Sequence, residues 1–260
     1  MFVDSHCHLD RLDLSACNND LQSVIDAATG KNVSRMLCVA IDLQNLPEML
    51  ETVNRFDNVY ASAGVHPLHV SDGVPEVATL LGYATDANVI ALGETGLDYY
   101  YQKDTVEQQR DSFVNHLKAS AEARLPVIVH TRDAREDTIS ILRQHVDTDV
   151  AGVLHCFTEN WEMARQAMDL NFMISFSGII TFRNAAELRE VVRQVPMENL
   201  LIETDSPYLA PVPYRGKPNE PQYVVEVAQC VADIKGLRIE EVAEITSDNF
   251  DRMFNKAVTG

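Results

Sequence analysis

Eight short apolar runs, rich in Val, Ile and Leu, recur along the chain and constrain its fold more than any other feature. Most of them are uninterrupted, which is typical of strands in a parallel sheet that is covered on both faces. The runs that we expect to be strands span residues 1–4, 35–40, 59–64, 89–93, 126–129, 151–154, 173–177 and 200–204.

Amphipathic segments fill the gaps between these runs. Over residues 106–123, Phe113, Leu117 and Ala121 recur at helical spacing with charged residues between them. The alternation of apolar runs and helical segments predicts repeated βαβ units and an α/β fold with a parallel sheet. Further helices are expected over residues 47–55, 134–144, 161–170, 185–194, 222–235 and 239–254.

The number of repeats distinguishes between two parallel architectures. Eight repeats favour a closed (β/α)8 TIM-like barrel over an open, doubly wound sheet. No Gly-x-Gly-x-x-Gly turn follows the first run, which weakens the dinucleotide-binding alternative. Because the 260 residues contain no low-complexity linker, we expect a single barrel domain over residues 1–260.

Charge and cysteine content narrow the class of protein further. The net charge of -18 argues against a broad basic surface that binds duplex nucleic acid. Bound metal ions and a few arginines can still bind a nucleic-acid strand locally. The five cysteines include no Cys-x-x-Cys pair, which favours reduced thiols. Since neither a signal peptide nor a bilayer-spanning stretch is recognisable, we expect a cytoplasmic protein.

His6 and His8 stand two residues apart at the end of the first expected strand. Side chains alternate along a strand, so both histidines should point to one side and Cys7 to the other. A His-x-His pair alone is weak evidence for a metal. The pair gains weight because other apolar runs also end in possible ligands, namely Glu94, His130, His155 and Asp205.

In a parallel barrel these strand ends meet at one mouth, where barrel enzymes place their catalytic residues. Four imidazoles and two carboxylates suffice for two divalent ions, and they suit Zn, Mn, Fe, Co or Ni better than Mg alone. Glu94 is the natural bridge between two metals. Asp205 should hold one metal and accept a proton from the nucleophilic water. Glu203 either supports the centre from below or has a buried structural role.

Several ordered blocks of sequence resemble the TatD-related metal-dependent hydrolases of the amidohydrolase-like barrels, and most of all their YcfH-type bacterial members. The resemblance extends over essentially the whole length, and no ligand position departs from it. The blocks are residues 3–10 (VDSHCHLD), 64–67 (GVHP), 91–99 (ALGETGLDY), 129–132 (VHTR), 154–157 (LHCF), 175–178 (SFSG) and 203–207 (ETDSP).

This resemblance implies a two-metal site and a metal-dependent nuclease activity, with cleavage of DNA from its 3′ end as the expected class. It also implies a division of the ligands between the metals. One metal would take His6, His8, Glu94 and Asp205, and the other would take Glu94, His130 and His155. Fold and site do not fix the substrate, because related barrels act on other esters.

Other residues near the mouth are candidates for binding substrate. His66 ends the third run and either contacts a phosphate or an active-site water, or is a core histidine. Asp98 and Tyr99 follow Glu94 in a loop where positioning groups belong. Arg132, two residues after His130, is placed to neutralise a phosphate. Arg183, Arg215 and Lys217, which we expect on loops at or near the barrel top, are candidates for contacts along a nucleic-acid backbone. For these residues, as for Arg132, ordinary surface charge is the alternative.

Several other residues carry weaker signals. Tyr99, Tyr100 and Tyr101 either stack an unpaired base or simply pack locally. His69, His116 and His145 are expected to be exposed or to cap helices. No Gly-x-Ser-x-Gly turn is present, which removes the serine hydrolase class.

The leading hypothesis is a deoxyribonuclease that uses two divalent ions, with Mg, Mn and Zn as candidates, to trim single-stranded or frayed DNA ends. DNA would bind transiently, and the sequence gives no sign of a membrane or an obligate protein partner. A second hypothesis is a carboxylic ester or amide hydrolase, such as an aminoacyl-tRNA deacylase. A third is an inactive, metal-bound scaffold.

Overall fold

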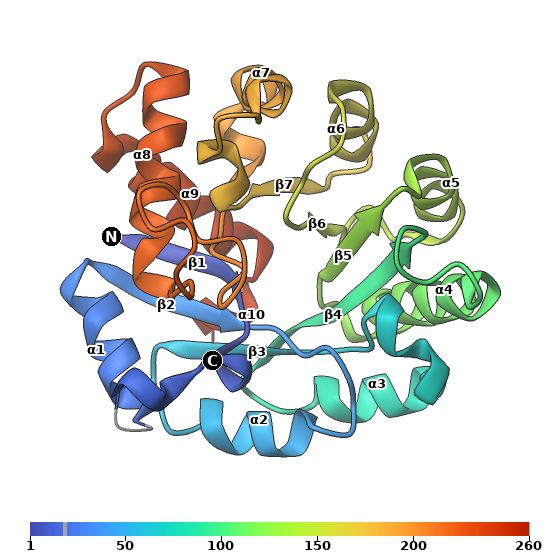
Figure 1. The fold of residues 1–260 in the computed structure, drawn as a ribbon. Coiled ribbons are helices and arrows are strands. Elements are labelled where there is room, and N and C mark those ends of the chain that lie inside the picture. The colour runs from blue at the N-terminus through green and yellow to red at the C-terminus, as the bar shows by residue number, and fades with distance from the viewer. Residues whose placement is uncertain (18–19, 260) are drawn as a thin grey trace.

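A computed structural model of the chain, which describes residues 1–17 and 20–259, contains one parallel sheet of eight strands in the order β1 to β8. The sheet curls into a nearly closed barrel, with helices around its outside (Figure 1). The predicted α/β barrel is therefore confirmed. Its strands are β1 (Phe2–Cys7), β2 (Val33–Cys38), β3 (Val59–Ala63), β4 (Val89–Asp98), β5 (Val127–Arg132), β6 (Gly152–Leu154), β7 (Met173–Phe176) and β8 (Leu200–Ile202).

The helices that follow the strands agree with the sequence pattern, apart from some that the prediction missed. The first missed helix repeats buried side chains at Leu21, Val24, Ile25 and Ala28, a helical spacing that the sequence does display. The main helices are α1 (Leu21–Gly30), α2 (Leu46–Val53), α3 (Val77–Ala84), α4 (Val106–Ala123), α5 (Arg135–His145), α6 (Trp161–Met168), α7 (Ala186–Gln194), α8 (Val224–Lys235), α9 (Ile239–Met253) and α10 (Lys256–Thr259).

Three strands are longer at their carboxyl ends than the apolar pattern predicts. His6 lies within β1, Glu94 within β4 and His130 within β5. The expectation that each possible ligand closes its strand is therefore wrong at these positions. Apolar patterning cannot show the extension, because backbone pairing does not require apolar side chains; Gly96, for example, pairs with His130 in the parallel ladder.

Hydrogen bonds from residues after β8 bring the last strand against the first. The Asp205 N–H donates to the His6 carbonyl at 2.9 Å. The Thr204 N–H and hydroxyl donate to the two Asp4 carboxylate oxygens at 2.8 and 2.5 Å. These bonds place His6 and Asp205 side by side, although the two residues lie near opposite ends of the sequence.

Apolar side chains fill the interior of the barrel at the end opposite the strand carboxyl ends. Val3, Ile90 and Leu201 belong to one buried cluster there with Phe250 and Phe254 of the C-terminal helical region. A much larger cluster lies between the sheet and the surrounding helices. None of the described helices is both long and apolar enough to cross a membrane.

The cysteines that the structure describes at the side-chain level are free thiols, namely Cys7, Cys38, Cys156 and Cys230. This agrees with the predicted reduced state. The Cys17 side chain lies outside the described part of the chain.

Candidate metal centre

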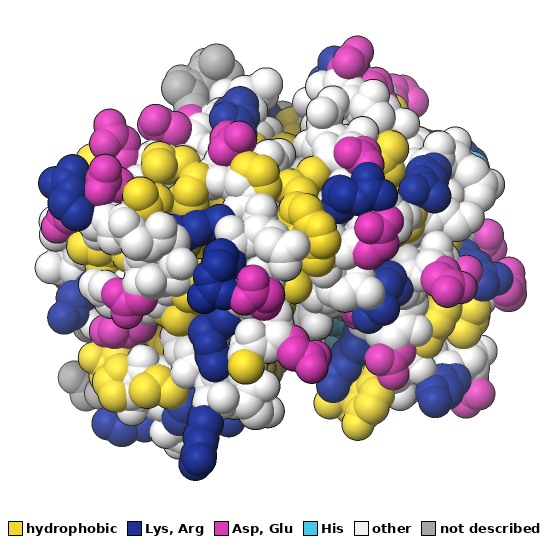
Figure 2. Space-filling view, turned by 90° about the horizontal axis from the view of Figure 1, so that it is seen from above, with side chains coloured by type: hydrophobic (Ala, Val, Ile, Leu, Met, Phe, Trp, Pro, Cys, Tyr) yellow, Lys and Arg dark blue, Asp and Glu magenta, His cyan; other side chains and the backbone are white. Residues whose placement is uncertain are grey.

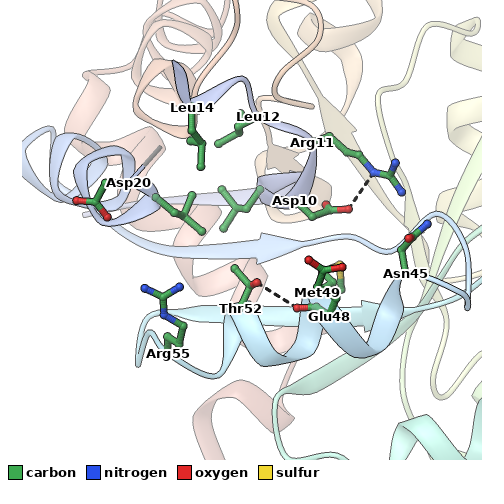
Figure 3. Close-up of a pocket in the computed structure, with 12 residues that line it drawn as sticks. Asp10, Arg11, Leu12, Leu14, Asp20, Asn45, Glu48, Met49, Thr52 and Arg55 are labelled. Carbon is green, nitrogen blue, oxygen red and sulfur yellow. Dashed lines mark hydrogen bonds and ion pairs between the residues drawn. The ribbon is translucent and has the colours of Figure 1, made fainter. Parts of the chain in front are cut away.

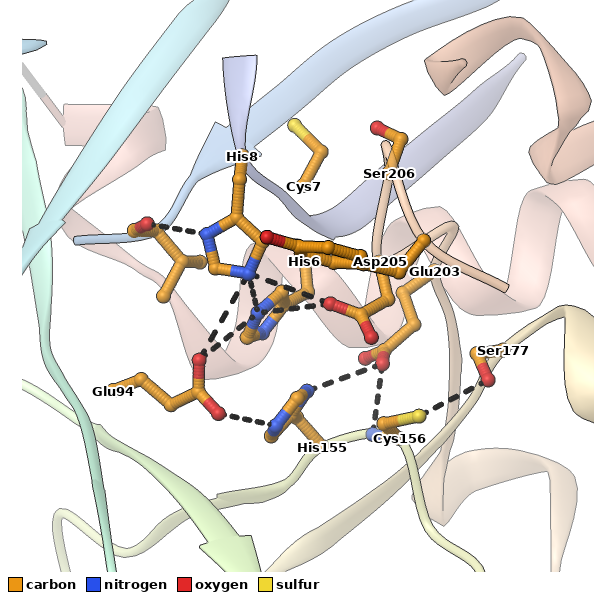
Figure 4. Close-up of polar contacts among 12 residues, drawn as sticks. His6, Cys7, His8, Glu94, His155, Cys156, Ser177, Glu203, Asp205 and Ser206 are labelled. Carbon is orange, nitrogen blue, oxygen red and sulfur yellow. Dashed lines mark hydrogen bonds and ion pairs between the residues drawn. The ribbon is translucent and has the colours of Figure 1, made fainter. Parts of the chain in front are cut away.

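The six predicted ligands converge at the carboxyl-terminal mouth of the barrel. Figure 4 shows Glu94 between His8 and His155, with Asp205 directed toward the two N-terminal histidines. The Cys7 thiol turns the other way and donates to the Leu37 carbonyl at 3.4 Å, as alternation along the strand predicts.

The Glu94 carboxylate separates the ligands into two groups. Its Oε2 lies 3.5 Å from His6 Nε2 and 4.0 Å from His8 Nε2, and these two nitrogens are 3.3 Å apart. Asp205 Oδ1 completes this side, 3.4 Å from His8 Nε2. The Nε2 atoms and the Asp205 carboxylate lie close enough to share one ion, since the ligand atoms of this trio are all within 4.8 Å of one another.

The second group gathers around Glu94 Oε1. His155 Nε2 is 2.7 Å from this oxygen, and His130 Nδ1 is 3.2 Å from it. The two imidazole nitrogens are 3.4 Å apart. His66 Nε2 also lies 3.3 Å from Oε1, so a third imidazole reaches this side. One carboxylate therefore faces both groups, as expected for a bridging ligand.

Acceptors behind three of the histidines fix the protonation of their rings. His8 Nδ1 lies 2.8 Å from the Val39 carbonyl, His130 Nε2 is 3.3 Å from Asp98 Oδ2, and His155 Nδ1 is 3.3 Å from Glu203 Oε1. Each of these oxygens can only accept, so the outer nitrogen carries the proton. In the neutral ring the inner nitrogen then presents a lone pair to the cavity.

Lone pairs and carboxylate oxygens that converge in this way repel one another unless a positive charge lies between them. The buried His6 Nδ1 and Glu203 Oε2 also have no hydrogen-bond partner among the described residues. A divalent cation suits imidazole and carboxylate donors of this kind. The residues present therefore fit a metal centre.

The pKa shifts of Glu94 and His155 also indicate that this site favours a positive charge beside the carboxylate. Burial opposes the charge of Glu94, but His155, His66 and His130 outweigh it and hold the Glu94 pKa well below its usual range. Burial also opposes a charged His155, yet Glu94 and Glu203 raise the pKa of His155 well above its usual value. In the absence of a metal, protons on the imidazoles take the place of the cation.

His66 differs from the other imidazoles at the centre. Its Nδ1 accepts a hydrogen bond from the Leu68 N–H at 3.1 Å, which leaves the proton of the neutral ring on Nε2. Burial lowers the pKa of His66 and keeps the ring neutral. His66 therefore faces Glu94 as a hydrogen-bond donor, which is the property of a group that contacts substrate more than of a metal ligand.

Asp98 and Glu203, two of the predicted substrate-side residues, lie behind the ligands. Glu203 Oε1 accepts from His155 and also from the Cys156 N–H at 2.7 Å. Asp98 is buried, and its carboxylate orients the His130 ring. Carboxylates that orient ligating histidines raise the basicity of those ligands and restrict their movement.

The structure does not bring Tyr99 to the ligands. Its hydroxyl donates to Asp137 at 2.7 Å and accepts from Arg110 at 3.2 Å, in a network between α4 and α5. Arg132 is exposed at the end of β5, with its guanidinium over Tyr100 and Tyr101.

Local backbone geometry allows β4 to approach β5 closely beside the ligands. Gly96 has a φ of +123°, and a Cβ at this position would lie 2.1 Å from the His130 carbonyl oxygen. Asp205 is a non-glycine residue with a φ of +55°. Such residues are uncommon and occur preferentially at functional sites.

Sequence reasoning missed two buried polar residues that hold the site in place. Burial raises the pKa of Asp4, which joins β1 to Thr204, to about 8. His116 was expected to be exposed or capping, but it is fully buried in α4. Its Nε2 accepts from the Val65 N–H at 3.2 Å, directly before His66. A lone polar residue within an amphipathic helix gives no signal of such a long-range contact.

A surface pocket also lies away from these ligands. It has a volume of about 350 Å³ and lies between the loop after β1 and helix α2. Figure 3 shows that Arg11, Asn45 and Arg55 line it, and none of the six ligands does.

A parallel eight-stranded barrel with imidazoles and carboxylates at the carboxyl ends of its strands has the arrangement of a divalent-metal hydrolase. Residues 3–255 match the sequence profile of the family described as TatD related DNase. The chain belongs to this family.

Individual relatives agree with this assignment. The chain is 51% identical to the uncharacterized metal-dependent hydrolase YcfH of Escherichia coli K12, over 97% of this chain and 95% of the relative. It is 40% identical to the uncharacterized metal-dependent hydrolase YabD of Bacillus subtilis, over 98% and 99% of the two chains. The crystal structure of YjjV, a TatD homolog from E. coli K12, has a TM-score of 0.89 and 27% identity and covers 98% of both chains. These similarities place the protein among the metal-dependent hydrolases of the TatD family.

Proposed function

We propose that this protein is a two-metal phosphodiesterase that trims single-stranded or frayed DNA from the 3′ end. The observation that carries the proposal is the arrangement of Glu94, whose two carboxylate oxygens face separate groups of ligands. His6, His8, Glu94 and Asp205 would hold one ion, and Glu94, His130 and His155 the other. Bound divalent ions would supply Lewis acidity at the phosphoryl group and lower the pKa of a water.

Asp205 is the group that we assign to proton transfer. Its side chain is 13% exposed, against 3% for Glu94, so it is the more accessible carboxylate at the mouth. Burial opposes its charge, but hydrogen bonding to His8 and the nearby imidazoles lower the Asp205 pKa. An ionised, accessible carboxylate can accept a proton from a water that attacks phosphorus.

His66 and Arg132 are the groups that we assign to substrate contacts. The His66 Nε2–H is directed at the centre and can donate to a phosphate oxygen. The Arg132 guanidinium, two residues beyond His130, provides positive charge where a strand would approach. Glu203 would act through His155 and Asp98 through His130, as positioning residues.

The charge distribution favours transient binding at strand ends. Lys and Arg side chains are interspersed with Asp and Glu on the face shown in Figure 2, and the whole chain carries a net charge of -18. Such a surface neutralises few phosphates at a time, so affinity for long duplexes should be low.

Digestion of single-stranded DNA labelled at either end, with Mg²⁺ or Mn²⁺, tests this function. We expect the labelled strand to be shortened stepwise from its 3′ end, and we expect EDTA or the Asp205→Asn change to abolish this digestion. Asp137→Asn, which removes a carboxylate between α4 and α5, is the matched control and should retain digestion.

The other two hypotheses correspond to other outcomes of the same experiment. If metal-loaded protein digests no oligonucleotide, the nuclease proposal is wrong, and hydrolysis of an aminoacyl ester should be measured next. If neither substrate turns over, and Glu94→Gln complements a deletion strain as well as the wild type, the scaffold hypothesis is favoured.

A further inference from the structure

Two large aromatic side chains beside the metal centre lie largely exposed to solvent. Tyr100 is 53% and Tyr101 62% exposed, directly after the end of β4. Exposed aromatic groups that lie together beside an active site are characteristic of ligand-binding surfaces, because packing alone would bury them.

Arg132 joins the two tyrosines into one surface, which we call the Tyr100–Tyr101–Arg132 corner. The two rings meet edge to face, with centroids 4.7 Å apart and planes at 87°. The Arg132 guanidinium carbon lies 4.3 Å from the Tyr100 centroid and 4.6 Å from that of Tyr101. A cation held over two aromatic faces combines positive charge with planar surfaces for stacking.

The corner is connected directly to the ligands. Asp98 Oδ1 accepts hydrogen bonds from the Tyr100 and Tyr101 N–H groups, at 2.9 and 2.8 Å. The other oxygen of the same carboxylate lies 3.3 Å from His130 Nε2. Because β4 and β5 lie side by side, the corner sits at the ends of the strands that carry Glu94 and His130 (Figure 1).

We propose that the Tyr100–Tyr101–Arg132 corner stacks the unpaired base of the nucleotide whose phosphodiester occupies the metal centre. This inference rests on the proposed function and deepens it, because it assigns the recognition of unpaired ends to particular residues. Nucleobases are planar and attached to anionic phosphates, so rings and guanidinium match both parts of the ligand. A base within a duplex has both faces covered by its neighbours and offers no free face to the corner.

The test compares two single-stranded oligonucleotides that differ only at the 3′ end. One carries normal bases, and the other carries tetrahydrofuran abasic sites at its last two positions. The measured quantity is the ratio of KM for the abasic strand to KM for the normal strand. Since stacking contributes about 1–3 kcal/mol per base, the wild-type ratio should be about 5–150.

Protein variants then locate the origin of this ratio. The double variant Tyr100→Ala/Tyr101→Ala should bring the ratio close to unity, and Tyr100→Phe/Tyr101→Phe should restore it because the rings remain. Arg132→Ala should reduce the ratio. Arg165→Ala, which removes an exposed arginine of α6, is its matched control and should leave the ratio unchanged.

Failure of this inference can be distinguished from failure of the proposed function. A protein that digests both strands with the same ratio before and after the double alanine change overturns the stacking role alone. If no strand is digested, the nuclease proposal fails, and the corner is tested by fluorescence anisotropy of the labelled strands in EDTA. Equal binding of normal and abasic strands by the wild type would then overturn it as well.

Discussion

The two ends of the barrel interior are built from opposite kinds of side chain. At the amino-terminal end of the strands, Val3, Ile90 and Leu201 pack against Phe250 and Phe254 in a buried apolar cluster. At the other end, buried imidazoles and carboxylates face one another. Burying apolar surface stabilises the fold, whereas burying charged groups costs free energy unless they are compensated. Stability and chemistry are therefore separated along one axis, as in other barrel enzymes.

Replacing the carboxylate at the centre of the mouth should have the largest effect on activity. We expect Glu94→Gln to lower kcat/KM at least 1,000-fold, about 4 kcal/mol, because both ligand groups lose their shared anion. Circular dichroism should show a folded protein. Retention of a tenth of the wild-type activity would contradict the bridging role.

A change at the opposite end should affect stability and leave the chemistry intact. Phe250 is fully buried in the apolar cluster, and its ring lies 4.7 Å from that of Phe254. Phe250→Ala should lower the free energy of unfolding by about 3–5 kcal/mol through the cavity it leaves. At a temperature where the variant is folded, kcat should stay within about twofold of the wild type. A large loss of kcat in folded protein would show that the two ends are coupled.

Acid should weaken the support of the mouth through His116. Burial lowers the pKa of His116 to about 4, below its ordinary value of 6.5, so folding favours the neutral ring. The neutral ring therefore stabilises the folded state fully above pH 6.5. This stabilisation, up to roughly 3 kcal/mol of the free energy of unfolding, is lost as the pH falls from 6.5 toward 4. Urea unfolding across this range should therefore show less loss of stability in His116→Gln than in the wild type. Identical pH profiles would rule out this contribution.

A smaller effect is expected from the carboxylate that orients His130. Asp98→Asn should weaken divalent metal binding about 10–100-fold, since the histidine loses an anionic partner. Isothermal titration of Mn²⁺ or Zn²⁺ measures this change. Asp137→Asn is the control, because Asp137 pairs with Arg110 and Tyr99 away from the ligands. Equal metal affinities for the two variants would mean that Asp98 does not contribute to metal binding.

Much of the fold and the ligand set can be predicted from the sequence, for definite physical reasons. Buried parallel strands are covered on both faces, so they leave uninterrupted apolar runs that are easy to recognise. Polar residues at the ends of such runs stand out against them, which is why His130 and His155 are visible as candidates. The side on which His6 and His8 lie follows from the two-residue period of a strand.

The sequence could not show where the strands end or what stands behind the ligands. The pairing of β1 with β2 shifts register between Asp4 and Cys7, so the partners of the strand change beside the first ligands. A shift of this kind depends on the neighbouring strand and leaves no trace in the local pattern.

By itself, then, the sequence determined the eight-strand parallel pattern and the identity of the six residues that converge at the mouth. Only the tertiary structure decided which ring nitrogens face the cavity, because acceptors from distant segments set them: the Val39 carbonyl, Asp98 and Glu203. It also decided that Tyr99 turns away while Tyr100 and Tyr101 stay exposed around Arg132. Local periodicity sets which face of an element is buried, whereas contacts between elements set the orientation of each side chain.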